Sequence, residues 1–362
     1  MPRHAWLSLT ALCLAATPAL GDGSDIPRTA SGRPDLSGVY NVATLTPLQR
    51  PKQFEGQASL TDAEAEAIAE RWRNYIAKDS APSDPNRSAP PAGGTEFYIP
   101  EFEGAAGGVG GYNAFFVDVG NSSFKLDGAW RTSIIVDPPN GRLPPLSEHG
   151  MARLASSRER MQENTGTAWW VNQETGPYDD PEMRPLGERC LLGFGSTSGP
   201  PMLPVMYNNL KRIVQTEDTV MILAEMNHDA RIIRIDGEHE PDSVRKWMGD
   251  SIGHWEGDEL VVKTTNFRET TGLMLGSADL RVEERFSRID QATLRYRFTV
   301  EDPNWTASWT GEYPWPATDE RVFEYACHEG NYALGGILRG ARVLERDALA
   351  QQDESSGKSS GR

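Results

Sequence analysis

The sequence predicts a mainly β protein: an antiparallel lipocalin-like barrel or curled sheet, wrapped by an irregular N-terminal region that contains two short helices. Two observations support this prediction. From residue 210 onward, short runs of alternating apolar and polar residues recur with turn residues between them, which is typical of antiparallel strands in succession. The 362 residues also include 35 Gly and 25 Pro, about one residue in six, which favours turns and short strands over long helices.

Residues 1–21 have the organisation of a signal peptide. Arg3 supplies a positive start, residues 6–16 are apolar, and the small residues Ala19 and Gly21 lie where a signal peptidase would cleave. The apolar run is too short to cross a membrane, and no later segment approaches the required length. We therefore expect an exported protein, periplasmic or secreted, with no membrane span after cleavage.

The charge balance and the motifs argue against several classes of function. Lys and Arg number 36 against 52 Asp and Glu, which gives a formal net charge of −16 without a basic run. A nucleic-acid partner is therefore not expected. The chain contains no phosphate-binding glycine loop, no Gly-x-Ser-x-Gly nucleophile motif and no paired spacing of metal ligands. We expect neither a cofactor nor a metal.

The predicted wrapping region, residues 22–204, contains two helix starts. Thr61 and Glu64 have the spacing of a capping box, in which the hydroxyl and the carboxylate each accept from a free backbone N–H. Ser147 can cap a second helix. Helices are therefore expected near residues 61–77 and 147–163, and short strands at 38–44 and 131–137.

The predicted β domain spans residues 205–345. Turn signals such as Asp236-Gly237 separate its strands. Residues 346–362, which are polar and rich in Ser and Gln, are expected to form a disordered tail. The expected strands are 212–215, 219–235, 259–267, 279–289, 293–301 and 307–313.

Cleavage of the signal peptide leaves two cysteines, Cys190 and Cys327. An even pair in an oxidising compartment favours a disulfide, which would contribute about 2–4 kcal/mol of stability. Two buried free thiols are one alternative. A thiolate nucleophile at Cys327 beside His328 is another.

Strand alternation indicates which polar side chains face the interior. In the run 279–289, Glu284 shares a face with Val282 and Phe286, whereas arginines occupy the opposite face. His228 lies on the apolar face of the run 219–235. The other polar groups expected to point inward are Thr264, Asn266 and Tyr296.

Polar groups in an apolar interior need an explanation, because an unpaired one costs roughly 1–3 kcal/mol. The functional interpretation is an apolar pocket in which His228 acts as general base and Glu284 as acid or orienting group. The structural alternative is that each group is paired with the backbone or with an arginine such as Arg231. In the functional interpretation, the pair and a substrate oxygen would be positioned by Asn266, Thr264 and Tyr296.

The sequence therefore predicts an exported proton-transfer enzyme of the isomerase, lyase or hydratase type, acting on a small hydrophobic or aromatic molecule. A periplasmic carrier that binds a hydrophobic ligand in the same cavity without chemistry is the alternative. A structural or interaction module of the cell envelope is a third possibility.

Residues 249–258 place His254 and Trp255, together with Asp250, in an expected loop before a strand. Loops at the mouth of a barrel often carry binding groups, so His254 and Trp255 are candidates for substrate contact. The alternative is that they pack the end of the barrel.

Residues 325–332 hold His328 and Glu329 beside Cys327. They are candidates for contact with the same pocket, and the alternative is a turn held by the disulfide. A metal site formed by His228, His254 and His328 is chemically possible, but no pair among them has the spacing that would predict one.

Several motifs together resemble a large, uncharacterised family of exported bacterial proteins. The resemblance covers about residues 35–342 and implies export, but it carries no activity and no catalytic residues. The motifs include HDARIIRIDG (228–237), GDSIGHWEGDELVV (249–262), VEDPNWT (300–306) and YACHEGNY (325–332).

Residues 254–286 are also similar to lipocalin-like, or calycin, barrels, in which a Trp-x-Gly-Asp turn precedes an apolar strand. Residues 255–258 have this pattern. Where lipocalin-like proteins begin with Gly-x-Trp, this chain has Gly38-Val39-Tyr40, and residues 45–205 have no counterpart. The similarity implies a barrel with a large N-terminal addition.

Overall fold

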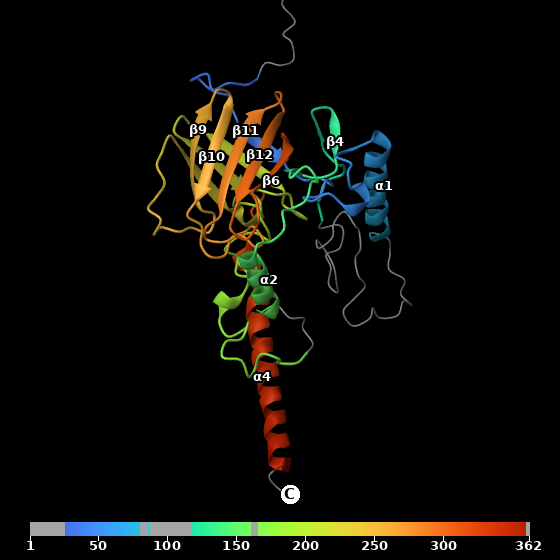
Figure 1. The fold of residues 1–362 in the computed structure, drawn as a ribbon, viewed down its shortest axis with the longest axis vertical. Coiled ribbons are helices and arrows are strands. Elements are labelled where there is room, and N and C mark those ends of the chain that lie inside the picture. The colour runs from blue at the N-terminus through green and yellow to red at the C-terminus, as the bar shows by residue number, and fades with distance from the viewer. Residues whose placement is uncertain (1–25, 80–85, 87–116, 161–165, 360–362) are drawn as a thin grey trace, which may run out of the picture.

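The computed structural model describes residues 26–79, 86, 117–160 and 166–359. A curled sheet forms the main body, a small sheet with one helix lies beside it, and a long helix projects away from it (Figure 1). The predicted signal peptide, residues 1–21, lies outside the described residues.

Ten strands form the main sheet, in the order β1-β6-β7-β8-β9-β10-β11-β12-β13-β5. Neighbouring strands are antiparallel except for β8 and β9, which are parallel. The strands are β1 (Gly38–Asn41), β5 (Ile135–Asp137), β6 (Leu210–Gln215), β7 (Thr219–Ala224), β8 (Ala230–Ile235), β9 (Asp250–Glu256), β10 (Glu259–Thr265), β11 (Arg281–Arg288), β12 (Thr293–Glu301) and β13 (Trp309–Pro316).

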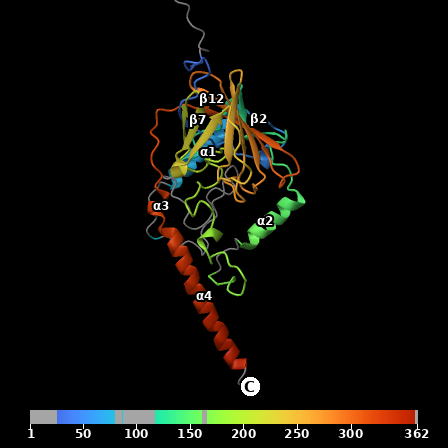
Figure 2. The same ribbon diagram turned by 90° about the vertical axis from the view of Figure 1, so that its left-hand side faces the viewer.

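The sheet curls into a half-barrel, so that its first strand comes back towards β13 (Figure 2). A backbone bridge joins Tyr40 of β1 to Ala317, directly after β13. The Thr318 N–H donates to the Val39 carbonyl at 2.9 Å. The predicted fold class, a mainly β protein built on a curled sheet, is confirmed.

The predicted strand 219–235 is two strands, because the chain turns at η5 (Met226–His228) between β7 and β8. This turn shifts the alternation of side chains by one residue. Ala224 is buried before the turn, whereas after it Arg231 is buried and Ala230 is exposed. The prediction that His228 continues the inner face was therefore wrong, and Arg231 takes an inner position instead.

β9 is a second difference from the prediction. Its residues were expected in a loop, but they pair with β10 along their whole length and with β8 in parallel. Ile233 of β8 lies beside Ser251 of β9 in this register. His254 and Trp255 are therefore strand residues.

The N-terminal region adds a small sheet and α1 (Asp62–Asp79). The predicted capping box starts this helix: the Thr61 N–H donates to Glu64 Oε2 at 2.7 Å, and the Glu64 N–H donates to Thr61 Oγ1 at 3.2 Å. Ile68 and Trp72 of α1 share a buried cluster with Leu60. The small sheet consists, in spatial order, of β2 (Ser59–Leu60), β4 (Ala129–Arg131) and β3 (Lys125–Leu126).

The second predicted helix is α2 (Glu148–Arg160). It begins at Ser147 as expected, because the Ser147 hydroxyl accepts from the Gly150 N–H at 3.1 Å. The remaining short 3-10 helices of the described residues are η1 (Lys52–Phe54) and η4 (Pro181–Met183).

The C-terminal residues are helical where a disordered tail was predicted. α3 (Cys327–Gly330) is followed by α4 (Tyr332–Ser359), so the prediction for residues 346–362 was wrong over residues 346–359. Ala341 of α4 is buried in a cluster with Trp170, whose indole N–H donates to Glu345 at 2.6 Å. A Trp-rich segment thus covers one face of α4, and the composition of the tail does not reveal this contact.

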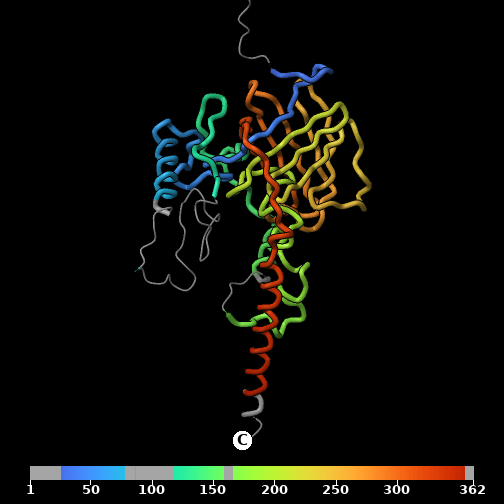
Figure 3. Tube along the Cα trace, turned by 180° about the vertical axis from the view of Figure 1, so that it is seen from behind, coloured from blue at the N-terminus to red at the C-terminus, as the bar shows by residue number. Residues whose placement is uncertain are grey.

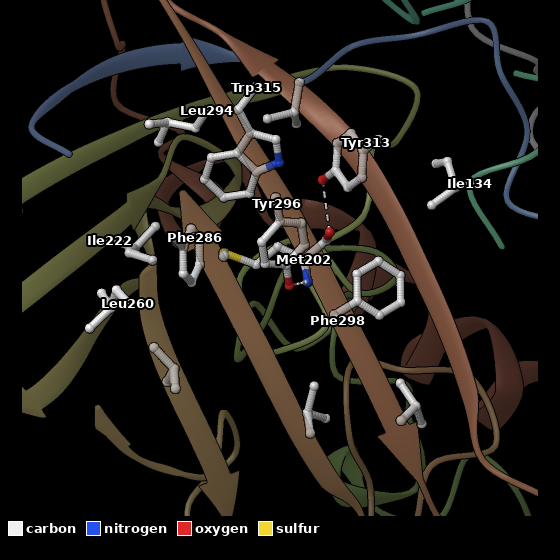
Figure 4. Packing of buried hydrophobic residues seen from close by; sticks show 14 of the residues in the cluster. Ile134, Met202, Ile222, Leu260, Phe286, Leu294, Tyr296, Phe298, Tyr313 and Trp315 are labelled. Carbon is white, nitrogen blue, oxygen red and sulfur yellow. Dashed lines mark hydrogen bonds between the residues drawn. The ribbon is translucent and has the colours of Figure 1, made fainter. Parts of the chain in front are cut away.

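The concave face of the curled sheet is filled by aromatic side chains (Figure 4). Residues 196–203, which we call the tongue, place Met202 against these rings. The Tyr296 hydroxyl accepts from the Met202 N–H at 2.9 Å, and the Tyr313 hydroxyl donates to the Met202 carbonyl at 2.8 Å. Two buried tyrosines therefore fix the tongue to the sheet.

A buried ion pair lies on the same concave face. Arg231 and Glu284 are 2 % and 0 % exposed, and two hydrogen bonds of 2.7 and 3.1 Å join them. The Tyr296 hydroxyl also donates to Glu284, at 2.7 Å. Burial and the negative charge of Glu284 raise the pKa of Tyr296 well above its usual value, so its hydroxyl stays protonated and remains a donor. Glu284 thus connects β8, β11, β12 and, through Tyr296, the tongue.

Glu284→Gln is expected to lower the free energy of unfolding by about 3–5 kcal/mol, because Arg231 keeps its buried charge and loses its counter-charge. Urea denaturation followed by tryptophan fluorescence measures the change. The double variant Arg231→Met/Glu284→Met removes both charges and is expected to recover most of the loss. An unchanged midpoint for Glu284→Gln would contradict this role of the pair.

Candidate functional site

The structure does not assemble the acid–base pair expected from the sequence. Both carboxylate oxygens of Glu284 are occupied, by Arg231 and Tyr296. His228 is exposed in the turn between β7 and β8, with its Nδ1 atom 3.1 Å from the Tyr325 carbonyl oxygen. The structural alternative considered for Glu284, pairing with Arg231, is the one that the structure contains.

The residues expected to bind substrate are dispersed. Thr264 is buried and shares a 2.9 Å hydrogen bond with the Ser251 hydroxyl. Asn266 follows β10 and donates to the Glu240 carbonyl at 2.8 Å. Thr264 and Asn266 do lie beside one cavity of about 660 Å³, which is also lined by charged side chains, among them Arg245, Lys263, Arg281 and Glu283.

The remaining predicted contacts lie elsewhere. His254 pairs with Glu256 at 3.1 Å on β9, and the Arg33 guanidinium lies over the Trp255 ring, 5.7 Å from its centre. His328 and Glu329 are exposed on α3. Tyr296 lies in the aromatic core described above. These side chains do not form one pocket with His228.

Asp250, which the sequence placed in a loop, is a buried structural acid at the start of β9. Burial acts to raise the pKa of Asp250, but hydrogen bonds from Arg234 and Lys246, with others from Glu240 N–H and His239, lower it well below its usual value. Its four partners leave it no free lone pair for chemistry.

A different cluster has the properties of a functional site, and its centre is Lys211 on β6. Lys211 is 0 % exposed, and its Nζ atom makes no hydrogen bond to any described residue. Burial lowers the pKa of Lys211 to about 7, although the negative charges of Asp229 and Glu225 act to raise it. A large part of the Lys211 population is therefore a neutral amine at neutral pH.

The two carboxylates that act on Lys211 come from the ends of the turn between β7 and β8. Glu225 Oε1 accepts from the Phe323 N–H at 2.9 Å. Asp229 Oδ2 accepts from the Ser198 hydroxyl of the tongue at 2.7 Å. Burial raises the pKa of Asp229, opposed by the hydrogen bond from Ser198 and by the charge of Lys211. An amine and two carboxyl groups are thus held together by three separate parts of the chain.

The turn itself has an unusual backbone. Asn227 and His228 have φ angles of 58° and 47°, a left-handed conformation that non-glycine residues adopt at some cost. Asn227 is 5 % exposed, yet both polar atoms of its side-chain amide have no hydrogen-bond partner among the described residues. Unpaired buried amide atoms of this kind are rare in proteins and are available to a ligand.

Gly193, just before the tongue, lies close both to the turn and to Thr197 of the tongue. A Cβ atom on Gly193 would lie 2.3 Å from both Met226 Cγ and Thr197 Oγ1, so a larger residue does not fit there. The Thr197 hydroxyl is likewise buried and unpaired within the described part of the chain. Four unpaired buried atoms, on Thr197, Lys211 and Asn227, therefore belong to this one region.

A cavity of about 260 Å³ adjoins the cluster. Glu225 lines it, and so does Leu210, whose side chain points to the opposite face of β6 from that of Lys211; Lys211 itself is not part of the lining. Glu320, Arg321 and Phe323 form another part of its lining.

Residues 317–326, which we call the strap, carry these last three side chains from the end of β13 towards α4 (Figure 3). The strap is attached at the turn by the Phe323 N–H and the Tyr325 carbonyl. Directly after it, Cys327 forms the predicted disulfide with Cys190. The strap thus closes the cavity on the side away from the sheet.

No protein-family model, curated protein or solved structure matches the chain. The resemblance to a family of exported bacterial proteins therefore stays a prediction from the motifs.

The described residues contain neither a cluster suited to a metal ion nor a helix suited to a membrane. Within residues 26–79, 86, 117–160 and 166–359, no group of three or more His, Cys, Asp or Glu side chains is placed to hold a metal ion. No helix in the described part of the chain has the length and apolar character needed to cross a membrane.

Sequence reasoning missed Lys211 although a signal was present. The predicted strand began at residue 212, two residues after the observed start at Leu210, and therefore left Lys211 out. Alternation from the inward Ile213 places Lys211 on the inner face. The strand pairing confirms this, since Lys211 lies between Tyr40 of β1 and Ala224 of β7, which are both buried.

The free energy of unfolding is expected to depend on pH through Lys211. The pKa of Lys211 is lower in the folded protein than in the unfolded chain, so protonation of Lys211 below about pH 7 lowers the free energy of unfolding. This loss of stability disappears as the pH rises towards 10.5, the pKa of the unfolded chain. Below pH 7 the loss amounts to about 5 kcal/mol.

Lys211→Met is therefore expected to be more stable than the wild type at pH 6, by an amount that shrinks by about 2–3 kcal/mol between pH 7 and pH 9. Urea denaturation at each pH measures this difference. Lys263→Met, which changes an exposed lysine of the same sheet, is the matched control and should show no such trend. A gap for Lys211→Met that does not vary with pH would show that the buried amine is not neutral.

Proposed function

We propose that this protein is an exported enzyme that performs proton-transfer chemistry on a small hydrophobic or aromatic molecule, with Lys211 as the general base. The observation that carries the proposal is the fully buried amine of Lys211, which makes no hydrogen bond to any described residue and on which the charges of Glu225 and Asp229 act. The reaction class is the one expected from the sequence, but the base is Lys211 in place of His228 and Glu284.

A purely structural role does not account for Lys211. A buried lysine without a hydrogen bond destabilises the fold, and an apolar side chain of similar length would fill the same space without that penalty. Groups that are retained at the expense of stability are typical of functional sites. Glu284 is the contrasting case, because its charge is fully paired and its removal is expected to weaken the fold.

The surroundings of Lys211 suit a general base. A base works best when its pKa is near the operating pH, and that of Lys211 is about 7. Once Lys211 has taken a proton from the substrate, Glu225 and Asp229 stabilise the ammonium group. The hydrogen bond from Ser198 holds the carboxylate of Asp229 in place. Lys211 is fully buried, which keeps bulk water away from the transfer.

The cavity supports a substrate smaller than most drug-like ligands, whose pockets run from about 300 Å³ upward. Leu210 and Phe323 offer apolar contact to such a molecule. The polar lining groups, among them Asn208, Asn209 and Glu225, offer hydrogen bonds that orient it.

Export is part of the same proposal. Residues 1–21 have the pattern of a signal peptide, and the Cys190–Cys327 disulfide is typical of proteins that mature in the periplasm or outside the cell.

The probe for this function is 5-nitrobenzisoxazole, a small aromatic compound whose ring opens when a base removes its single C–H proton and whose product absorbs visible light. The wild type is expected to open it at a rate that rises with pH through a midpoint near 7, as the amine of Lys211 becomes neutral. Lys211→Met should lose about a hundredfold or more of this rate.

The control for folding is part of the design, because Lys211→Met is expected to be at least as stable as the wild type. Lys263→Met should retain the full rate. A well-folded Lys211→Met protein with an unchanged rate, or a wild type no faster than that variant, would refute the proposal.

A further inference from the structure

The cavity of about 260 Å³ beside the strap has a strongly acidic lining. Three carboxylate side chains, those of Asp118, Glu225 and Glu320, line it against one guanidinium group, that of Arg321. Asp118, Glu320 and Arg321 are exposed, whereas Glu225 is only 5 % exposed. One of the three carboxylates is therefore almost completely removed from bulk water.

Glu225 has one oxygen engaged by the chain and one oxygen that the chain does not use. Its Oε1 atom accepts from the Phe323 N–H at 2.9 Å, and its Oε2 atom has no hydrogen-bond partner among the described residues. Lys211 acts on Glu225 only through its charge, since the Lys211 amine makes no hydrogen bond to any described residue. A buried carboxylate without a bound cation destabilises a fold. The position of Glu225 in the lining thus suits a cation that enters the cavity.

The spacing of the acids favours an organic cation over a metal ion. Within the described part of the chain, no group of three His, Cys, Asp or Glu side chains is placed to hold a metal, and the acids of this lining are no exception. A metal ion needs several oxygen ligands at once. An ammonium group is satisfied by one or two carboxylate oxygens, because its N–H groups donate charge-assisted hydrogen bonds to them.

The remaining lining residues supply apolar surface for the rest of such a molecule. Leu210 and Phe323 both line the cavity. Phe323 also binds Glu225 through its backbone N–H, which keeps an aromatic residue and a carboxylate in the same wall. A cation is attracted by the face of an aromatic ring as well as by a carboxylate. This combination is suited to an amine that carries an apolar group.

A cation can reach the cavity from solvent. The strap residues Glu320, Arg321 and Phe323 are exposed, Phe323 to 68 %. A ligand in the cavity would therefore cover apolar surface that is in contact with water, which favours binding. The formal net charge of −16 also attracts cations to the protein.

We propose that this cavity binds a small organic ammonium ion that carries an apolar or aromatic group, with Glu225 as the residue that binds the charged nitrogen. Glu225 Oε2 accepts a hydrogen bond from the ammonium group, and Asp118 and Glu320 add negative potential at the rim. Leu210 and Phe323 contact the apolar part. This inference goes beyond the proposed function, because it assigns a charge to the ligand and depends on Glu225 and not on Lys211.

The test is the binding of benzylammonium to the intact, disulfide-bonded protein at neutral pH, measured by a ligand-observed NMR titration. Benzyl alcohol, which has the same ring without the charge, is the comparison ligand. We expect benzylammonium to bind at least about tenfold more tightly, because a hydrogen bond between charged groups is stronger than one that involves a neutral donor. Equal affinities for the two compounds would overturn the inference.

Glu225→Gln removes the charge but keeps an oxygen that can accept from the Phe323 N–H, so the strap keeps its attachment. The affinity for benzylammonium is expected to fall by about tenfold or more, and that for benzyl alcohol to stay the same. Glu217→Gln, which changes an exposed acid beyond the other end of β6, is the matched control and should retain the full affinity. An unchanged affinity of Glu225→Gln for benzylammonium would contradict the proposed role of Glu225.

Asp118→Asn tests the same cavity independently of the folding of Glu225→Gln. Asp118 is exposed, so this variant is expected to fold, and its affinity for benzylammonium should fall about threefold. An unchanged affinity would show that the cation does not bind in this cavity. Displacement of benzylammonium by millimolar Ca²⁺ at constant ionic strength would assign the cavity to a metal ion and overturn the inference.

The outcome is separable from that of the proposed function. If benzylammonium does not bind while ring opening of 5-nitrobenzisoxazole still depends on Lys211, this inference fails and the proposed function stands. If benzylammonium binds through Glu225 while the protein opens no 5-nitrobenzisoxazole, the proposed function fails and the ammonium site stands.

Discussion

The buried ion pair between Arg231 and Glu284 is the interaction on which the rest of the structure depends. It crosses the concave face of the curled sheet, and it reaches the tongue through the Tyr296 hydroxyl. A guanidinium group stays charged in any protein environment, so its burial requires a carboxylate in bidentate geometry. The pair therefore ties β8 to β11 across the concave face, and Tyr296 extends the contact to the tongue. The position of the tongue, in turn, fixes the site at the neighbouring turn, because Ser198 of the tongue binds Asp229.

Arg231 and Lys211 are both buried basic side chains of the same sheet, but they differ in their partners and in whether they can lose a proton. Arg231 cannot lose its proton, and both of its terminal nitrogens bind Glu284, so its contribution is to the stability and shape of the fold. Lys211 has no hydrogen-bond partner in the described residues and can lose its proton, so desolvation lowers its pKa to about 7. Burial thus makes the amine unstable as a cation, because no hydrogen bond compensates for the lost contact with water. The difference between a structural charge and a functional one lies in the partners that the fold supplies.

The proposed site is built where distant parts of the chain meet. β6 contributes Lys211, the turn between β7 and β8 contributes Glu225 and Asp229, and the strap closes the cavity beside them. The disulfide between Cys190 and Cys327 joins the strap to the segment that leads into the tongue. A covalent link at this point limits how far the two can separate, which preserves the arrangement while local contacts open and close. The sheet is therefore the rigid part of the proposed site, and the strap over the cavity is the part that can move.

The sequence alone determined the features that depend on neighbouring residues. Alternation placed Glu284 and Tyr296 on the inner face, the capping box located the start of α1, and the cysteine count predicted the disulfide. Tertiary structure decided the rest. The turn at Asn227 shifts the alternation by one residue, so that Arg231 and not His228 points inward, and the composition around the turn does not reveal its left-handed backbone. Likewise, the neutrality of Lys211 arises from desolvation by segments that lie far away in the sequence, and no local pattern records which segments will surround a side chain.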